Sequence, residues 1–168
     1  MEDKAAYVQA MFAAIADRYD LLNHLLSFQR DRAWRKVAVS KCALQPGELV
    51  LDVATGTGEM ALEMTEHGKV IGIDFCQKML RQAKTKDASN VDFVLAMAEC
   101  LPFPDNVFDC ATIGFALRNV ADIPKTMQEM VRVTKIGGRV TCLEFSQLSN
   151  RLSNRVYRFY LFHILPLI

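Results

Sequence analysis

Apolar residues recur at helical spacing over the first 45 residues of the chain. Four of them, at intervals of four, three and four, predict a helix over 4–19 with one apolar face: Val8, Phe12, Ile15 and Tyr19. Leucine pairs near 21–26 and a third helical stretch around 33–39 continue this pattern until Gln45-Pro46-Gly47 interrupts it. Residues 1–45 are therefore expected to form a helical segment in front of the rest.

From residue 46 onward, short apolar runs alternate with helical stretches. The runs predict five strands, near 49–54, 69–74, 91–95, 109–115 and 139–145. Helices are predicted between them, over 58–67, 76–86 and 122–135. This alternation is typical of an α/β fold, and we expect a Rossmann-like, doubly wound and mostly parallel sheet with right-handed crossovers. The chain would then be one domain, 1–168, with its core at 46–146 and a C-terminal helix over 147–168.

The helix predicted over 122–135 carries boundary signals of its own. Asp122 can cap its start, and Pro124 suits its first turn. Gly137-Gly138 predicts its end. In a doubly wound sheet, a ligand binds beyond the carboxyl ends of the strands, beside the first strand.

The first predicted strand runs directly into a turn that contains two glycines. Glycine lacks a Cβ, so a ligand can approach the backbone there, and the next helix offers unpaired N–H groups at its positive end. Sixteen residues after Gly58, the second strand ends in Asp74, and an acid at this place suits the hydroxyls of a ribose. The pattern predicts an adenosine-type cofactor held by the turn and this acid: Asp52, Thr55, Gly56, Thr57, Gly58 and Asp74.

Three interpretations of this turn are open. Gly56, Gly58 and Ala61 fit the G-x-G-x-x-A form of a dinucleotide site, so NAD must be considered, and a tight turn without any ligand is a second alternative. S-adenosylmethionine is favoured because it carries a ribose but no phosphates, so that one βαβ half suffices. Its positive sulfonium also suits Asp52 and Glu59.

Two later loops reach the same edge of the predicted sheet. Met97 and Ala98 follow the third strand and could flank an adenine, although core packing is the alternative for Met97. Gly114, at the end of the fourth strand, leaves room for the methionine arm of the cofactor. Arg118 and Asn119 come next as candidate functional residues, and the alternative for Arg118 is to bind nearby carbonyl groups.

Composition narrows the class of protein further. With a net charge of +1 over 168 residues, bulk electrostatic binding to nucleic acid is unsupported. Five cysteines without a C-x-x-C pair are expected to be reduced and mostly buried thiols, and three isolated histidines predict no metal site. The charged start is no signal peptide, and no apolar run is long enough to cross a bilayer. We expect a cytoplasmic protein that contacts the membrane peripherally.

These motifs resemble class I S-adenosylmethionine-dependent methyltransferases, and more specifically the ubiquinone/menaquinone biosynthesis C-methyltransferases. The resemblance covers nearly the whole chain. It rests on five segments: Tyr19-Asp20-Leu21-Leu22-Asn23 with Ser27-Phe28 and Trp34-Arg35, the turn 52–58, the loop 98–109, Phe115-Ala116-Leu117-Arg118-Asn119, and Leu143-Glu144-Phe145-Ser146. The turn marks only the superfamily, whereas the first segment and the last two are far more specific.

The resemblance implies particular roles. Cofactor contacts fall on Thr57, Asp74, Met97, Ala98 and Gly114. Two of these depart from the family pattern, because Met97 stands where a polar Asn or Asp is usual and Gly114 where a hydroxyl residue is frequent. Arg118 would assist deprotonation of a polyprenyl quinol such as demethylmenaquinol, and three residues would line the acceptor pocket: Asn119, Tyr19 and Asn23.

Several points stay open at this stage. His24 is a candidate base or a structural residue, and Asp20 either orients a hydroxyl or caps the helix that begins near Leu21.

Residues 151–165 could form a basic, aromatic helix at a lipid surface, or could pack against the rest of the protein. The given sequence is expected to lack the family's C-terminal antiparallel hairpin, so that either it is a fragment or a partner covers the sheet edge, as in a homodimer. The rival functions are an inactive, cofactor-binding partner of a quinone biosynthesis assembly and a methyltransferase of another small aromatic or lipid acceptor.

Overall fold

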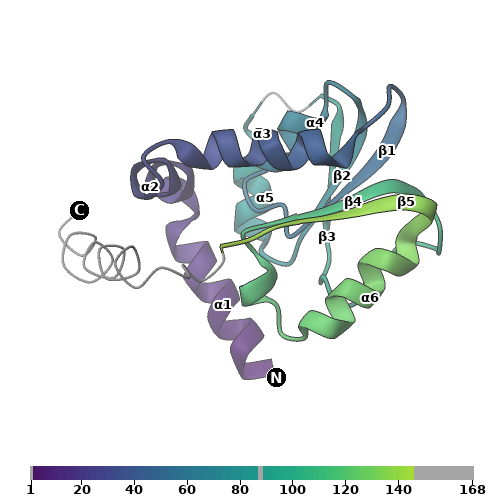
Figure 1. Cartoon of the computed structure of the whole chain (residues 1–168). Coiled ribbons are helices and arrows are strands. Elements are labelled where there is room, and N and C mark those ends of the chain that lie inside the picture. The colour runs from purple at the N-terminus through teal and green to yellow at the C-terminus, as the bar shows by residue number, and fades with distance from the viewer. Residues whose placement is uncertain (1, 87–88, 146–168) are drawn as a thin grey trace, which may run out of the picture.

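A computed structural model describes residues 2–86 and 89–145, and its centre is a five-stranded sheet (Figure 1). The strands are β1 (Glu48–Val53), β2 (Gly68–Asp74), β3 (Val91–Leu95), β4 (Phe108–Gly114) and β5 (Thr134–Leu143). They lie in the order β3-β2-β1-β4-β5, and every neighbouring pair is parallel. The expected Rossmann-like α/β fold is therefore confirmed, and the strand order reverses beside β1.

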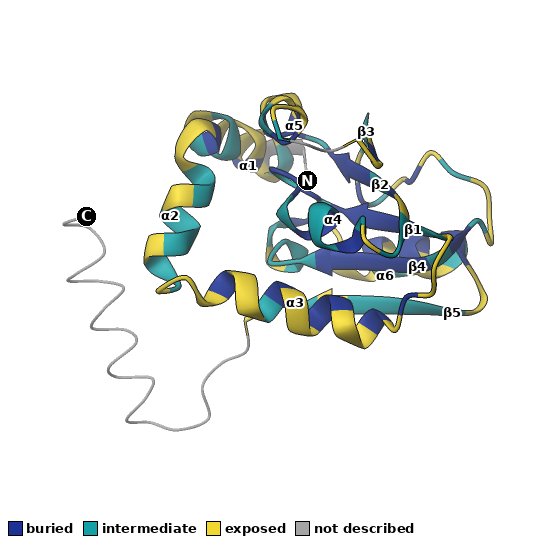
Figure 2. Ribbon diagram, turned by 90° about the horizontal axis from the view of Figure 1, so that it is seen from above, coloured by how far each residue is buried: buried dark blue, intermediate teal, exposed yellow. Residues whose placement is uncertain are grey.

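Six α-helices surround this sheet in the described part of the chain. They are α1 (Glu2–Ile15), α2 (Tyr19–Leu26), α3 (Arg30–Cys42), α4 (Glu59–Met64), α5 (Gln77–Lys84) and α6 (Ile123–Val133). Helices α1 and α2 lie at the end of the sheet toward which the strands point, as Figures 1 and 2 show. None of the described helices combines the length and apolar character needed to cross a bilayer.

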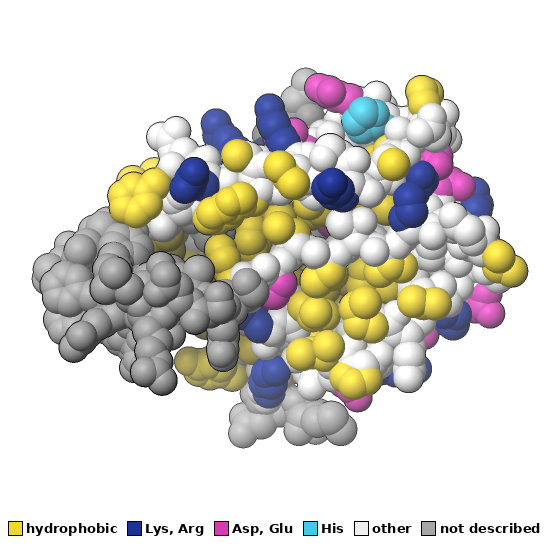
Figure 3. Space-filling view, in the orientation of Figure 1, with side chains coloured by type: hydrophobic (Ala, Val, Ile, Leu, Met, Phe, Trp, Pro, Cys, Tyr) yellow, Lys and Arg dark blue, Asp and Glu magenta, His cyan; other side chains and the backbone are white. Residues whose placement is uncertain are grey.

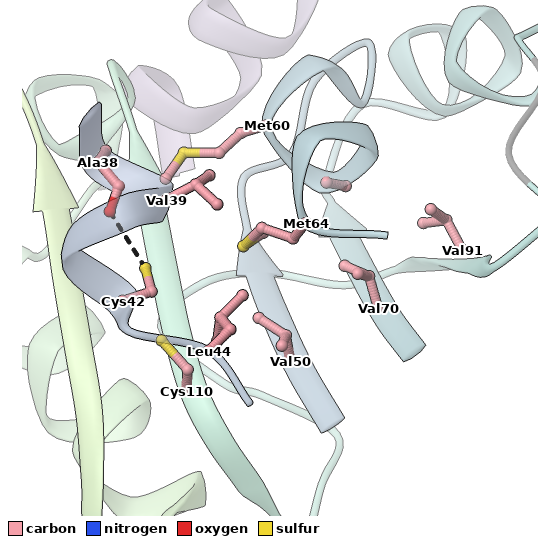
Figure 4. Close-up of a cluster of buried hydrophobic side chains, with 11 residues drawn as sticks. Ala38, Val39, Cys42, Leu44, Val50, Met60, Met64, Val70, Val91 and Cys110 are labelled. Carbon is pink, nitrogen blue, oxygen red and sulfur yellow. Dashed lines mark hydrogen bonds between the residues drawn. The ribbon is translucent and has the colours of Figure 1, made fainter. Parts of the chain in front are cut away.

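Each face of the sheet packs against its own hydrophobic core. On one face, α3 and α4 contribute Val39, Cys42, Met60 and Met64, which pack against strand residues that include Val50 (Figure 4). On the other face, α6 and the loop after β3 pack against β1 and β4 through a second cluster: Leu51, Leu101, Phe108, Ile113, Met130 and Val133. The two cores hold the strand ends in fixed positions relative to one another.

The junction of α6 and β5 differs from the sequence prediction. Asp122 caps α6 as expected and accepts a hydrogen bond from the Lys125 N–H (2.9 Å), but the helix ends at Val133 rather than at the two glycines. Thr134 already pairs with Phe108, and the register then shifts before Arg139 pairs with Cys110. The predicted helix end at Gly137-Gly138 is therefore wrong. A Cβ on Gly138 would lie 2.8 Å from the Asp109 carbonyl oxygen, so this glycine permits a close approach of β5 to the backbone of β4.

Other boundaries shift as well. The helix predicted over 4–19 is broken by a 3₁₀ turn at Ala16–Arg18, and α4 ends at Met64 instead of residue 67. The third helix is longer than predicted, because α3 extends over Arg30–Cys42. The helix expected over 147–168, with its basic and aromatic stretch at 151–165, lies outside the described residues.

Strand β5 is an outer strand of the described sheet, and it carries exposed apolar side chains among polar and charged ones. Hydrophobic side chains gather on the face of the molecule between α3 and α6 (Figure 3). Ile136 is 97% exposed, and Cys142 is exposed as well. Three of the five cysteines are buried, and all five are free thiols: Cys42, Cys76, Cys100, Cys110 and Cys142.

Candidate functional site

A cavity of about 990 Å³, including its open mouth, lies at the carboxyl ends of β1, β2 and β4. The structure brings ten of the residues predicted from the sequence to its wall: Tyr19, Asp52, Thr55, Gly56, Thr57, Asp74, Met97, Ala98, Gly114 and Asn119. Three other candidates do not line it: Asn23, Gly58 and Arg118.

The turn after β1 exposes its backbone to the cavity. Ala54 and Gly56 have φ angles of 53° and 58°, in the left-handed region that glycine tolerates best. A non-glycine residue with such a φ is strained, and strain of this kind gathers at ligand sites. Gly58 (φ 81°) has a packing role instead, because a Cβ there would lie 3.1 Å from the Phe93 ring.

Asp74 shapes the turn and faces the cavity. Its Oδ2 accepts a hydrogen bond from the Gly56 N–H (2.9 Å), and its Oδ1 accepts one from the Cys76 N–H (2.8 Å). Burial raises the pKa of this carboxyl, against the opposing effect of these backbone donors. Each carboxylate oxygen can accept a second hydrogen bond, so Asp74 keeps the capacity to bind a ribose diol.

Asp52 is a buried carboxyl beneath the same turn. It accepts hydrogen bonds from the hydroxyls of Thr55 (2.6 Å) and Thr112 (2.7 Å), which tie the end of β1 to β4. Burial raises its pKa to about 6, although both hydroxyl donors act in the opposite direction. Sequence reasoning missed Thr112, because only the register of β1 against β4 brings it opposite Asp52.

Met97 and Gly114, the two residues that depart from the family pattern, both line the cavity. Met97 is 46% exposed and lines the cavity, so core packing does not explain it. A Cβ on Gly114 would lie 2.9 Å from the Met60 sulfur, so a larger residue there would displace Met60 from the cavity wall. The loop after β3 is fixed from α6, where Glu129 accepts a hydrogen bond from the Leu101 N–H (2.8 Å).

The N-terminal helices close the cavity from above the turn. Asp20 accepts a hydrogen bond from the Thr57 hydroxyl (2.5 Å) and pairs with Lys86 (2.8 Å), which also binds Glu59 (2.6 Å). Helix α2 already begins at Tyr19, so the interpretation of Asp20 as a helix cap is wrong. Asp20 orients a hydroxyl, and that hydroxyl belongs to Thr57 of the cofactor turn.

An aromatic cluster lies beside the cavity, at the ends of β4 and β5. The rings of Phe115 and Phe145 stack with centroids 4.8 Å apart, and Trp34 packs edge-on against both, at 6.3 and 5.6 Å. Phe115 has a φ of 56° and also lines the cavity. A cluster of this kind can bind a flat aromatic ring.

Arg118 lies on the outer side of this cluster. It forms an ion pair with Glu144, and its guanidinium carbon lies 5.5 Å from the centroid of Phe145. Its interpretation as a residue that binds carbonyl groups is therefore wrong, because its partner is a carboxylate. The side chain is half exposed, while the neighbouring Asn119 faces the cavity.

His24 belongs to a structural network rather than to the cavity wall. Its Nδ1 lies 2.9 Å from Asp31 Oδ2, and Asp31 also pairs with Arg35 at 2.6 Å. Burial would raise the pKa of Asp31, but hydrogen bonds from His24, Ser27 and Arg35 outweigh it and lower the pKa to about 2. Sequence reasoning missed Arg35 as a cavity residue. Its i, i+4 spacing from Asp31 is the only local signal that could have indicated it.

The fold and this cavity define a class I S-adenosylmethionine-dependent methyltransferase. The model of the ubiE/COQ5 methyltransferase family matches residues 1–168, and the chain belongs to that family. It is 42% identical over 177 residues to the ubiquinone/menaquinone biosynthesis C-methyltransferase UbiE of Geobacter sulfurreducens, covering 100% of this chain and 69% of that protein. The protein of the same name from Francisella tularensis subsp. novicida is 44% identical over 174 residues, covering 98% of this chain and 70% of that one.

The comparison with solved structures agrees at the level of the fold. A SAM-dependent methyltransferase from Aquifex aeolicus matches with a TM-score of 0.67 and 23% sequence identity. The match covers 79% of this chain and 75% of that one.

Proposed function

We propose that the chain transfers a methyl group from S-adenosylmethionine to a ring carbon of a lipid-linked quinol such as demethylmenaquinol. The observation that carries this proposal is the aromatic cluster beside the cavity, in which Phe115 lines the cavity wall, stacks on Phe145 and so connects the wall to the neighbouring Arg118. The two UbiE relatives, whose names give quinone biosynthesis as their role, support it.

The cavity fits the cofactor that the family uses. Asp74 can accept the ribose hydroxyls, the bare backbone at Gly56 admits the sugar, and Met97 with Ala98 can flank the adenine. When bound there, S-adenosylmethionine supplies an electrophilic methyl group on a sulfonium. The carboxyls of Asp52 and Glu59 at the wall suit a positive ligand.

The acceptor side must make a ring carbon nucleophilic. This happens when the neighbouring hydroxyl of the quinol loses its proton, so the acceptor must arrive in its reduced form. The cation of Arg118 would stabilise the resulting oxyanion, directly or through a water, while Glu144 fixes the direction of the guanidinium. Stacking on the aromatic cluster would hold the ring in place, and orientation of this kind can contribute about 7–11 kcal/mol.

Two further parts of the proposal concern partners. We expect the polyprenyl tail of the acceptor to bring the protein to a membrane surface. We also expect the apolar surface along β5 to support contact with a second copy of the chain, because an outer strand with apolar side chains favours association.

The test is a transfer assay with methyl-labelled S-adenosylmethionine and reduced demethylmenaquinol in detergent. We expect label in the ring carbon, and Arg118→Met should lower kcat by roughly 10²–10⁴-fold while the affinity for S-adenosylhomocysteine stays unchanged. Arg81→Met, at an exposed arginine of α5 outside the cavity wall, serves as the matched control. Cofactor binding without any transfer would contradict the proposal and favour an inactive partner protein.

A further inference from the structure

Arg35 is a buried arginine that reaches the cavity from outside the α/β core. It lies in α3, is only 7% exposed, and still forms part of the cavity wall. A buried cation is costly unless it is paired, and here Asp31 pairs with its Nη1 at 2.6 Å. Asp31 is itself held by His24 and the Ser27 hydroxyl, so the guanidinium is fixed by a network of its own.

This network uses only part of the guanidinium. Arginine has five N–H donors, and within the described residues the one hydrogen bond of Arg35 is that of Nη1 to Asp31. Its other contact is with the face of Phe115, whose ring centroid lies 5.6 Å from the guanidinium carbon. Donors therefore remain available on a rigid, charged group at the cavity wall.

Arg35 differs in the sign of its charge from the acidic side chains of the cavity wall. Among the described residues that line the cavity, it is the one cationic side chain, and the same wall carries four acids: Asp52, Glu59, Asp74 and Glu99. A ligand that carries both an ammonium and a carboxylate would match this distribution. The guanidinium fork is also the side chain best suited to bind a carboxylate through two parallel hydrogen bonds.

The position of Arg35 indicates which part of the cofactor it meets. Asp74, Met97 and Ala98 place the adenosine at the ends of β2 and β3. Arg35 lies at the opposite end, over Phe115, which follows β4, and close enough to Asp52 for its charge to favour ionisation of that carboxyl. The amino-acid group is the part of the cofactor farthest from the adenine.

We propose that Arg35 binds the α-carboxylate of the amino-acid end of the cofactor. This inference rests on the proposed function only in assuming that the cavity takes S-adenosylmethionine. The network of Asp31, His24 and Ser27 then acts through Arg35 as a positioning device, and Asp52 remains available for the neighbouring α-ammonium.

Two ligands that differ by a single group test this assignment. S-adenosylhomocysteine carries the carboxylate, and its decarboxylated form, S-adenosyl-3-thiopropylamine, lacks only that group. Calorimetric titration of the whole chain should show that Arg35→Met weakens binding of S-adenosylhomocysteine by about 10- to 100-fold, the range for a lost charged hydrogen bond. Binding of the decarboxylated ligand should change less than about twofold.

Control variants distinguish the loss of the Arg35–carboxylate contact from a general folding defect. Arg35→Lys retains the charge without the fork and should give an intermediate loss for S-adenosylhomocysteine alone. Arg30→Met, at an exposed arginine of the same helix, should leave both affinities unchanged. The decarboxylated ligand reports whether the adenosine end of each variant is intact.

The possible failures are distinguishable. Equal weakening of both ligands, or unchanged binding of S-adenosylhomocysteine to Arg35→Met, would overturn the assignment while leaving the proposed cofactor in place; the second result would point to the acceptor as the partner of Arg35. If the wild-type chain bound neither ligand, the proposed function and this inference would fall together.

Discussion

The two ends of the cavity are built in different ways. In the part of the cavity proposed for the cofactor, backbone N–H groups and the buried carboxyls Asp52 and Asp74 form the wall, and each carboxyl accepts hydrogen bonds from neighbouring groups. At the acceptor end, Arg118 and Phe145 are about half exposed and come from the ends of neighbouring strands. The difference suggests that cofactor affinity is fixed by the fold itself, whereas acceptor recognition depends on side chains that can change with little cost to stability.

The largest effect is expected from the buried carboxyl under the turn. The pKa of Asp52 is about 6 in the folded chain, whereas an aspartate of the unfolded chain titrates near 4. The folded chain therefore holds a proton that the unfolded chain has released, and the free energy of unfolding falls as pH rises from about 4 to 6. Asp52→Asn cannot ionise. Relative to wild type, its free energy of unfolding should therefore gain about 3 kcal/mol between about pH 4 and pH 7.5. Urea unfolding at the two pH values measures this change.

The carboxyl of Glu129 in α6 provides a control whose effect on stability has the opposite pH dependence. Hydrogen bonds from Arg132 lower the pKa of Glu129 to about 2, so Glu129 stabilises the fold above the pKa of the unfolded chain and this contribution is lost on acidification. Glu129→Gln should therefore cost more at neutral pH than at acid pH. A constant difference between Asp52→Asn and wild type at both pH values would show that Asp52 is not protonated in the folded chain.

The second-largest effect is expected on cofactor affinity, which should depend on the cofactor end of the cavity and not on the acceptor end. Asp74→Asn removes a charged acceptor of the ribose hydroxyls and should weaken S-adenosylhomocysteine by about 1.5–3 kcal/mol, which calorimetry can measure. Asp92→Asn, at an exposed acid of β3 that pairs with Lys69 on the surface, is the matched control. Unchanged affinity in Asp74→Asn would remove Asp74 from the cofactor site.

The smallest effect is expected at the acceptor end. Phe145→Leu loses the stacked contact with Phe115 and should raise KM for the quinol by the equivalent of about 0.5–1.5 kcal/mol, with cofactor affinity and thermal stability nearly unchanged. Steady-state kinetics at saturating cofactor measure this shift. A parallel loss of S-adenosylhomocysteine affinity would mean that the two ends are coupled and that the comparison does not hold.

The same contrast explains what could be predicted from the sequence. The strands, the glycine turn and Asp74 were predictable because they depend on local periodicity and on one strand–turn–helix unit. The acceptor end was not, because Trp34 meets Phe115 and Phe145 only after α3 docks near the ends of β4 and β5, about 80–110 positions later in the chain. Thr112 and Arg35 were missed for the same reason.

The error at the end of α6 had a different physical cause. A glycine pair usually predicts a helix end, but here the helix ends four residues earlier, where Thr134 adopts an extended backbone and its hydroxyl binds the Met130 carbonyl (2.7 Å). Gly137 and Gly138 serve the irregular start of β5 instead. The glycine pair correctly indicated a place where the backbone needs conformational freedom. That place is the start of β5 and not the end of α6.

The edge-on packing of Trp34 also gives the protein an optical reporter. Trp34 is the only tryptophan of the sequence, and it touches both rings of the aromatic cluster. Its intrinsic fluorescence therefore arises from a single place, beside the acceptor end and remote from the adenosine end. A quinol that stacks on the cluster would quench this emission without any label or engineered residue, so acceptor binding can be titrated in the unmodified protein.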